Sequence, residues 1–328
     1  LTKTIDPLTG ETIFGYDDRD NLLVLTDSEN QNTRFSYDEN SRLLTETRPG
    51  GQSASFSYDN GGNLLSKTDS KGQKIEYGYN DANQMTSNHY FTATDLVTPA
   101  KSISYAYNPV GTLLSYSDGT TSGNYTYDKL NRKLTDTINY GSFNLTNMYT
   151  YYANGLKKSY TSPDSITYDY SFDNNNQLAG IAIPDNGFIT YNSYTWNRPD
   201  SITLPGGSTR QYSYDPLMRL QSLTVKDPAQ KVIMDYQYSY DQMNNITTKQ
   251  TEHGDYDYQY DELYRLTEAD NPAQLDEVYS YDKVGNRLTA ADVAGQFLYN
   301  ENNELLSVDD TSFEYDDNGN TTSITKDG

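Results

Sequence analysis

The chain of 328 residues contains no cysteine, only two histidines and a single tryptophan. Without cysteine it cannot form disulfides, zinc–thiolate sites or a cysteine nucleophile. His89 and His253 have no recognisable catalytic partner in the sequence, so histidine-based acid–base catalysis is not expected. No apolar run approaches the length of a membrane span. Basic residues are also few, 24 against 46 acidic ones, and the net charge of −22 argues against nucleic acid or an anionic membrane as the partner.

Tyrosine is the residue that the chain has in excess. Its 33 tyrosines stand in a sequence that is only 34% hydrophobic, so aromatic rings must supply much of the buried surface. Tyrosine suits a pleated strand, because its ring packs on neighbouring strands while its hydroxyl reaches water or a polar group. This composition therefore favours β-structure.

The tyrosines belong to a repeat, shown most clearly by residues 56–64, Phe-Ser-Tyr-Asp-Asn-Gly-Gly-Asn-Leu. The two aromatics lie on one face of a strand, since side chains alternate with a period of two. We call the second aromatic the anchor and number other positions from it. The first four anchors are 21 residues apart, and in every unit the residue two positions earlier is aromatic too. The fifteen anchors are Tyr16, Tyr37, Tyr58, Tyr79, Tyr107, Tyr127, Tyr151, Phe172, Trp196, Tyr214, Tyr240, Tyr260, Tyr281, Tyr299 and Tyr315.

The residues after each anchor predict a tight turn. Position +1 is Asp or Asn in fourteen units, and position +4 is Gly, Asn or Asp in twelve, the residues that best tolerate positive φ. This predicts a three-residue hairpin loop between +1 and +5, with a left-handed residue at +4 and a bulge. The residue at +6, usually aliphatic, then lies opposite the anchor. At Lys133, Leu156 and Arg287 the pattern is displaced by one, and we expect an altered bulge there.

A second turn ends each repeat, so each unit contributes about two strands. We predict an all-β fold in which residues 1–328 form one continuous array of about fifteen antiparallel β-hairpins, with an insertion near residues 86–102. Strands twist, so a ribbon this wide cannot stay flat and must form a long curved or spiralling sheet.

Residues 58–72 and 281–288 match the pattern Y-D-x-x-G-R-L-x-x-x-T-x-x-x-G. From Phe14 to its end the chain resembles the YD-repeat or Rhs-repeat family. This family includes bacterial Rhs toxins, the C component of insecticidal ABC toxin complexes and the teneurins. The resemblance implies a spiralling shell of β-hairpins, which encloses a C-terminal toxic domain in the toxins and belongs to an adhesion ectodomain in teneurins.

The chain departs from the toxins at the motif that releases their cargo. In the toxins the repeats end in an Asp-Pro-x-Gly-Leu type motif, at which an aspartyl protease activity releases the cargo. The nearest strings here, Asp6-Pro7-Leu8-Thr9-Gly10 and Asp215-Pro216-Leu217, do not fit it and are interpreted as turns. We therefore assign no cargo release to this chain.

Other binding chemistry has to be weighed against turn formation. Asp17 with Asp20, and Asp316 with Asn318, offer several oxygens within one turn and leave open a loose calcium site, although neither string meets the spacing of an EF-hand. Paired carboxylates recur in every repeat, whereas a catalytic pair should be singular. Exposed tyrosine faces could bind sugar rings, but we interpret the rings, Trp196 included, as a packed ladder.

We therefore expect a non-catalytic structural module without a cofactor. It would form part of the shell wall of a secreted or surface-exposed bacterial protein, and its partners would be an effector or flanking domains of the same polypeptide. An adhesion or carbohydrate-binding surface, whose partner would be a glycan or a cell-surface receptor, is the alternative, and an enzyme comes third. The unpaired edge strands of an open ribbon also predict end-to-end self-association.

Overall fold

The computed structural model describes residues 1–272 and 274–326, and these residues form antiparallel β-structure almost throughout. In this part of the chain the one helix is a short 3-10 turn, η1 (Pro205–Gly207). No helix among these residues has the length and apolar character needed to cross a membrane. The chain divides into two compact units. The first comprises Leu1–Ser104, Gln259–Asp270 and residues 274–326, and the second is Tyr105–Tyr258 with the short segment that begins at Asn271.

The strands of the first unit come from both ends of the chain. They are β1 (Lys3–Ile5), β2 (Glu11–Tyr16), β3 (Leu22–Thr26), β4 (Asn32–Tyr37), β5 (Leu43–Thr47), β6 (Ser53–Tyr58), β7 (Leu64–Thr68), β8 (Lys74–Tyr79), β9 (Met85–Phe91), β25 (Leu266–Ala269), β26 (Glu277–Val278), β27 (Ser280–Tyr281), β28 (Arg287–Thr289), β29 (Leu298–Tyr299), β30 (Leu305–Val308), β31 (Thr311–Tyr315) and β32 (Thr321–Lys326). β10 (Lys101–Tyr107) and β24 (Gly254–Tyr260) cross the borders between the units.

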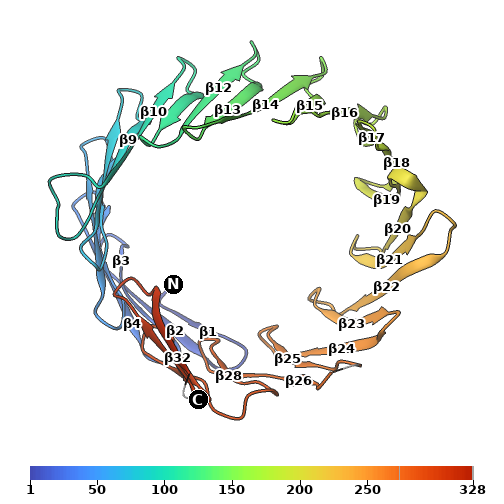
Figure 1. Ribbon diagram of the computed structural model, residues 1–328. Helices are drawn as coiled ribbons and strands as arrows, with labels where there is room; N and C mark the ends of the chain where they lie inside the picture. Colours follow the sequence, from blue (N-terminus) through green and yellow to red (C-terminus); the bar gives the residue numbers. More distant parts are fainter. Residues whose placement is uncertain (273, 327–328) are drawn as a thin grey trace. The chain divides into compact units, whose positions relative to one another are not determined.

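The second unit is a single run of strands. They are β11 (Leu113–Ser117), β12 (Ser122–Tyr127), β13 (Lys133–Asn139), β14 (Asn144–Tyr151), β15 (Lys157–Thr161), β16 (Thr167–Phe172), β17 (Leu178–Ile183), β18 (Gly187–Thr195), β19 (Arg198–Thr203), β20 (Thr209–Tyr214), β21 (Leu220–Lys226), β22 (Val232–Tyr240) and β23 (Ile246–Thr251). Figure 1 follows the hairpins in chain order, and strands adjacent in sequence pair antiparallel. Among the described residues, β1–β26 form a 26-stranded sheet, β27–β28 a pair and β29–β32 a four-stranded sheet. The predicted all-β array of antiparallel hairpins is confirmed.

The hairpin loop has the predicted geometry. In the repeat anchored by Tyr58, the amide of Asp59 donates to the carbonyl of Asn63, and Tyr58 pairs with Leu64 across a bulge. Position +4 has positive φ in fourteen of the fifteen units, including Ser41, Met218 and Tyr264, whose side chains do not favour it. The turn therefore imposes its conformation even where the residue type resists.

A second set of turns joins one repeat to the next at the opposite edge of the strands. We call these the return turns, and those that follow the anchors the anchor turns. In the return turn at residues 69–73, Asp69 donates its amide to the carbonyl of Gln73 and accepts the amides of Lys71 and Gln73 with its carboxylate. The strands are therefore connected by similar turns at both of their ends.

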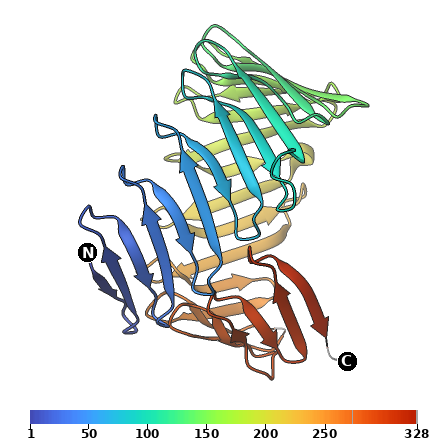
Figure 2. The same ribbon diagram turned by 90° about the vertical axis from the view of Figure 1, so that its left-hand side faces the viewer.

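The sheet buries little. The buried hydrophobic residues of the described chain are Phe91, Ile202, Ala290 and Phe297, and no large side chain there is fully buried. In Figure 2 the blue strands β1–β9 of the first unit lie side by side in one layer. Contacts between neighbouring repeats, rather than a deep core, must hold such a layer together.

At the predicted insertion near 86–102, β9 and β10 pair with each other and leave residues 92–100 as a loop. One expectation needs correction. The altered bulges are wrong, because Lys133, Lys157 and Arg287 pair with their anchors in the same register as Leu64. Their cations lie over aromatic rings instead, and those of Lys133 and Arg287 are 5.0 Å and 4.7 Å from the ring centroids of Tyr125 and Phe297.

Candidate functional site

The anchor tyrosines join each repeat to the one before it. The hydroxyl of Tyr240 donates to the carbonyl of Leu220 at 2.7 Å, and Leu220 is the +6 residue of the preceding repeat. The hydroxyl of Tyr79 donates to the equivalent carbonyl of Leu64 at 3.1 Å. The same bond to position +6 of the preceding repeat is made by Tyr127, Tyr151, Tyr281, Tyr299 and Tyr315, and Tyr214 donates to the carbonyl of Pro199. Partial burial raises the pKa of Tyr79 and Tyr240 above the usual value.

The acidic residue at +1 caps its own turn. The carboxylate of Asp59 accepts the amide of Asn63 at 2.8 Å and the side-chain amide of the same residue at 2.8 Å. These bonds favour the charged form, and the side-chain bond of Asn63 is the main cause that lowers the pKa of Asp59. Asn80 makes the same backbone bonds with its amide oxygen. The +1 carboxylates are thus occupied by backbone donors.

A link at position +5 was not recognised in the sequence. The guanidinium of Arg219 donates to Asp215 of its own turn at 2.6 Å and to the carbonyl of Asp241 in the next turn at 2.9 Å. It also lies over the ring of the next anchor, Tyr240, at 4.6 Å. Arg42, Arg132 and Arg265 make the equivalent contacts. The YD pattern carries Arg at this position, and that signal could have revealed the link.

Asparagine replaces arginine at +5 in several repeats. Asn63 donates to Asp59 and to the amide oxygen of Asn83, which lies in the next anchor turn. Asn286 bridges Asp282 and Asn303 in the same way. The anchor turns that contain Asn63 and Asn286 are therefore each linked to the next anchor turn through one side chain.

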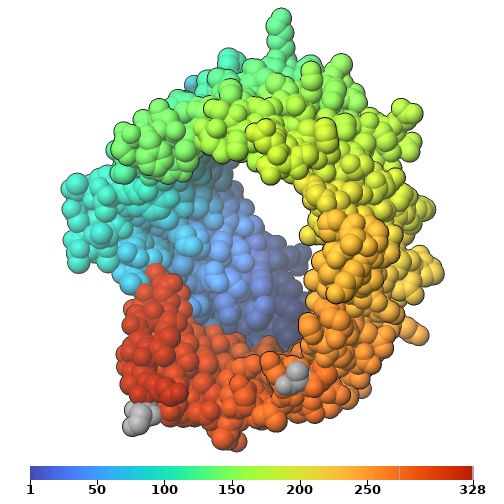
Figure 3. Space-filling view, turned by 45° about the vertical axis from the view of Figure 1, so that its right-hand side comes forward, coloured from blue at the N-terminus to red at the C-terminus, as the bar shows by residue number. Residues whose placement is uncertain are grey.

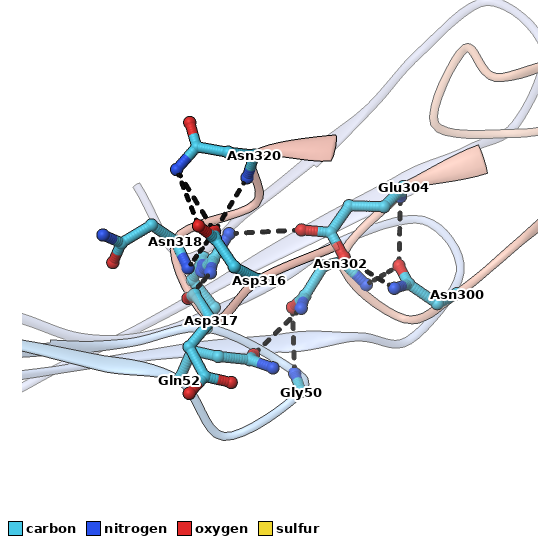
Figure 4. Close-up of polar contacts among 10 residues, drawn as sticks. Gly50, Gln52, Asn300, Asn302, Glu304, Asp316, Asp317, Asn318 and Asn320 are labelled. Carbon is cyan, nitrogen blue, oxygen red and sulfur yellow. Dashed lines mark hydrogen bonds and ion pairs between the residues drawn. The ribbon is translucent and has the colours of Figure 1, made fainter. Parts of the chain in front are cut away.

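In the first unit, return turns from the start of the chain contact anchor turns from its end, and we call this contact the seam. Asn302 accepts the amide of Gly50 at 2.9 Å and donates to Gln52 at 2.9 Å (Figure 4). Asn318 donates to the carboxylate of Asp69 at 2.8 Å. Figure 2 shows the red C-terminal strands beside the blue N-terminal ones.

Charged groups reinforce the seam. Lys71 and Asp316 form an ion pair at 2.8 Å, and Arg48 lies 3.5 Å from Glu304 while it donates to the carbonyl of Asp317. The Lys71 ammonium holds the pKa of Asp316 far below its usual range, and the same contact raises the pKa of Lys71. The first unit is thus closed by polar contacts between segments about 250 residues apart in sequence.

Successive turns meet in order along the seam. Leu8 and Gly10 of the first return turn line a groove together with Leu263. In the next return turn, Glu29 accepts the amide of Lys283. In Figure 3 the orange-red part of the first unit borders its blue part. The seam is therefore a row of turns packed on a second row of turns.

Fourteen anchors end their strands as expected, and Trp196 does not. It lies in the turn between β18 and β19, with positive φ and a side chain that is 86% exposed. The anchor role falls to Tyr194, whose hydroxyl donates to the carbonyl of Leu178 at 2.6 Å. The pattern aromatic-x-aromatic was therefore matched two residues too late in this repeat, and Trp196 is not part of the ladder.

The calcium candidates are engaged in turns. Asp17 accepts the amides of Arg19 and Asn21, and Asp20 adopts a positive φ as the +4 residue. The carboxylate of Asp316 accepts the amide of Asn318. Across residues 1–272 and 274–326, no group of three or more His, Cys, Asp or Glu side chains is placed to hold a metal ion. The geometry of these turns gives a metal site no support.

One histidine has a partner that the sequence did not reveal. The Nδ1 atom of His89 lies 2.9 Å from the hydroxyl of Ser102, directly across the strands β9 and β10. This pair is exposed, whereas nucleophilic catalysis needs a base and nucleophile enclosed with groups that stabilise the transition state. His253 is exposed beside Glu252. Neither histidine therefore supports an enzymatic site.

Comparison with known proteins points to one architecture. The family model of the teneurin YD-shell matches residues 13–150. The crystal structure of TcdB2-TccC3-Cdc42 superposes with a TM-score of 0.75 and 14% identity, over 96% of this chain and 20% of that chain. The Photorhabdus luminescens Tc holotoxin pore, with a mutated TccC3, gives a TM-score of 0.69 and 14% identity over 98% of this chain and 22% of that one. The chain thus spans about a fifth of the length of these solved chains. A search of the curated proteins found no match.

Proposed function

We propose that this chain, which resembles YD-repeat shells in its repeats and in the arrangement of its strands, is a non-catalytic section of the wall of such a shell. In this proposal residues 1–328 are one continuous array, and the wall encloses or presents an effector domain of the same longer polypeptide. The observation that carries the proposal is the arrangement of the strands, which agrees with the TcdB2-TccC3-Cdc42 structure over 96% of the chain.

The use of polar groups supports a structural role. Anchor hydroxyls, +1 carboxylates and +5 side chains bind backbone groups of their own or neighbouring repeats, as Tyr240, Asp59 and Arg219 illustrate. A catalytic acid or base would instead need to face a substrate. The proposed setting is the exterior of a bacterial cell, as for a secreted or surface-displayed protein.

The test is protection of a cargo. The coding sequence that flanks this chain should encode further YD repeats and an effector domain. Expressed together, the shell segment should shield that effector from added protease, and a variant with the seam broken at Asn302 and Asn318 should lose the shielding. Cleavage of the effector at the same rate with and without the repeats would reject the proposal.

A carbohydrate-binding surface is the second candidate, and the exposed indole of Trp196 favours it. The side chains of Trp196 and Phe188 are 86% and 67% exposed, and an exposed aromatic face can stack on a sugar ring. A glycan array should then show binding that Trp196→Ala abolishes and Leu217→Ala retains. An array without signal would exclude this candidate and leave the shell proposal untouched.

A further inference from the structure

Four anchor turns of the second unit carry an exposed apolar side chain at position +3, and this +3 row is interrupted by Asn154 and Asn175 at the same position of two turns between them. Val110, Leu130, Leu217 and Met243 occupy this position, and they are 74%, 69%, 69% and 52% exposed. In each turn the +1 side chain accepts the amide of the +3 residue, which fixes the backbone at the tip. Several apolar groups held at one edge form an unusual surface for a soluble chain.

Position +3 is the contact position of the seam in the first unit. Leu263, Asn302 and Asn318 are all +3 residues, and each meets a return turn from the start of the chain. Leu263 is only partly exposed there, whereas Leu130 and Leu217 are open to solvent. The +3 row of the second unit thus corresponds to the +3 residues of the first unit, which pack on return turns in the seam.

The return side of the second unit also exposes several apolar side chains, among polar residues such as Asp164 and Asp185. The rings of Tyr140 and Phe143 stack at 5.1 Å in one return turn, and Phe143 is 54% exposed. Phe188 and Ile233, which follow two other return turns, are 67% and 55% exposed. Turn tips of this green and yellow part of the chain project from the body in Figure 3. One chain therefore carries both halves of a turn-on-turn contact.

We propose that the anchor turns of the second unit dock on the return turns of a second copy of this chain. Both sets of turns expose apolar side chains. In the proposed contact the +3 residues of one copy pack on the return turns of the other, as the +3 residues of the first unit do in the seam. Such a contact is heterologous, so each copy keeps one free row and further copies can add. Since every copy carries a net charge of −22, repulsion opposes association at low salt, and added salt should strengthen it.

The first test is sedimentation over a wide concentration range at low and high salt. We expect concentration-dependent association that increases with salt. The double variant Leu130→Ser with Met243→Ser should weaken it by about tenfold or more, because two apolar contacts are lost. The matched control is Leu114→Ser with Met148→Ser, which removes one exposed leucine and one exposed methionine from strands β11 and β14 of the same unit. A chain that stays monomeric at high salt, or equal weakening by both pairs, would overturn the proposal.

The second test identifies the row that is bound. The chain has no cysteine, so single cysteines can be introduced without background. A Leu217→Cys protein mixed with a Phe188→Cys protein should form a mixed disulfide faster than either forms with itself, while Leu114→Cys should not react with Phe188→Cys. Equal rates of homodimer and mixed dimer would show that like rows meet and would refute the head-to-tail contact. Thermal unfolding should match that of the parent chain for the serine variants, because all four sites are exposed.

Discussion

The guanidinium carbon of Arg219 lies 4.6 Å from the ring centroid of Tyr240, the anchor of the next repeat. The same guanidinium bonds Asp215 in its own turn and the carbonyl of Asp241 beyond the ring. A planar, forked cation can stack and bond in both directions at once, whereas an ammonium cannot. Stability of the array is therefore expected to depend on links between repeats as much as on each hairpin.

Replacing Arg219 by Lys should destabilise the second unit by about 1 kcal/mol, because an ammonium over the ring of Tyr240 cannot also keep the hydrogen bonds to Asp215 and to the carbonyl of Asp241. A double-mutant cycle with Tyr240→Leu isolates the interaction between the two side chains. The double variant should lose less stability than the sum of the losses in the two single variants. Chemical denaturation followed by circular dichroism gives the free energies of unfolding. Strict additivity would mean that the ring and the guanidinium do not interact.

Replacing Tyr240 by Phe removes only the hydroxyl that donates to the carbonyl of Leu220. The expected loss is about 1 kcal/mol, as for a typical net hydrogen bond. Tyr16→Phe is the matched control, because Tyr16 is also an anchor at the end of its strand but is 40% exposed. The thermal midpoint should fall for the first variant and stay constant for the second, and an equal fall in both would contradict the tyrosine link.

Acid should destabilise the chain through the +1 carboxylates. The pKa values of Asp17, Asp38 and Asp59 are lowered below 3.8 in the folded state by their turn hydrogen bonds. Their stabilising effect is therefore complete above about pH 4 and is lost as the pH falls through the lowered values. Asp59→Asn should keep the cap, as Asn80 does, and make thermal stability less dependent on pH below 4. An unchanged pH profile in this variant would rule out the carboxylate as the titrating group.

Alkaline pH should act on Tyr149. Burial, aided by a 3.0 Å hydrogen bond to the carboxylate of Asp136, raises its pKa to about 12 from the usual 10.0. The folded state keeps this proton while the unfolded chain loses it, so the stabilisation is complete below pH 10 and declines as the pH rises towards 12. The difference in stability between the parent and Tyr149→Phe should therefore shrink over this range in denaturant titrations. A constant difference would show that the pKa of Tyr149 is the same folded and unfolded.

The seam can be opened at Asn318, which donates to Asp69. Asn318→Ala combined with Asn302→Ala should raise the amide hydrogen exchange of β29–β32, because both contacts to the return turns are lost. Asn40→Ala is the control, since Asn40 is an exposed +3 residue of another anchor turn. Exchange that does not change in the double variant would show that the seam adds no stability.

The sequence predicted the hairpin because every part of its signal lies within one repeat. The phase of the anchors placed positive φ at Met218 and Tyr264, against the preference of those residue types. Trp196 was assigned wrongly because Tyr194 and Trp196 also satisfy the aromatic pair, and a tight turn there shifts the strand end by two residues. The pattern counts positions and cannot measure the length of a turn.

Links between repeats were harder to foresee. The role of Arg219 depends on the ring of Tyr240, which another repeat supplies. Asn302 and Asn318 resemble ordinary turn residues, and their partners lie about 250 positions away in sequence. No local property of these asparagines distinguishes them from Asn40, so only the folded chain reveals the seam.

The scarcity of buried side chains has an evolutionary consequence. In a protein with a central core, gain or loss of a segment disturbs the packing of everything around it. Here the duplication or deletion of one whole hairpin pair leaves no hole to fill, because the neighbouring repeats on either side pack through contacts that are the same in every repeat. Lineages of such genes should therefore differ by integral numbers of units, and fractional changes should be rare.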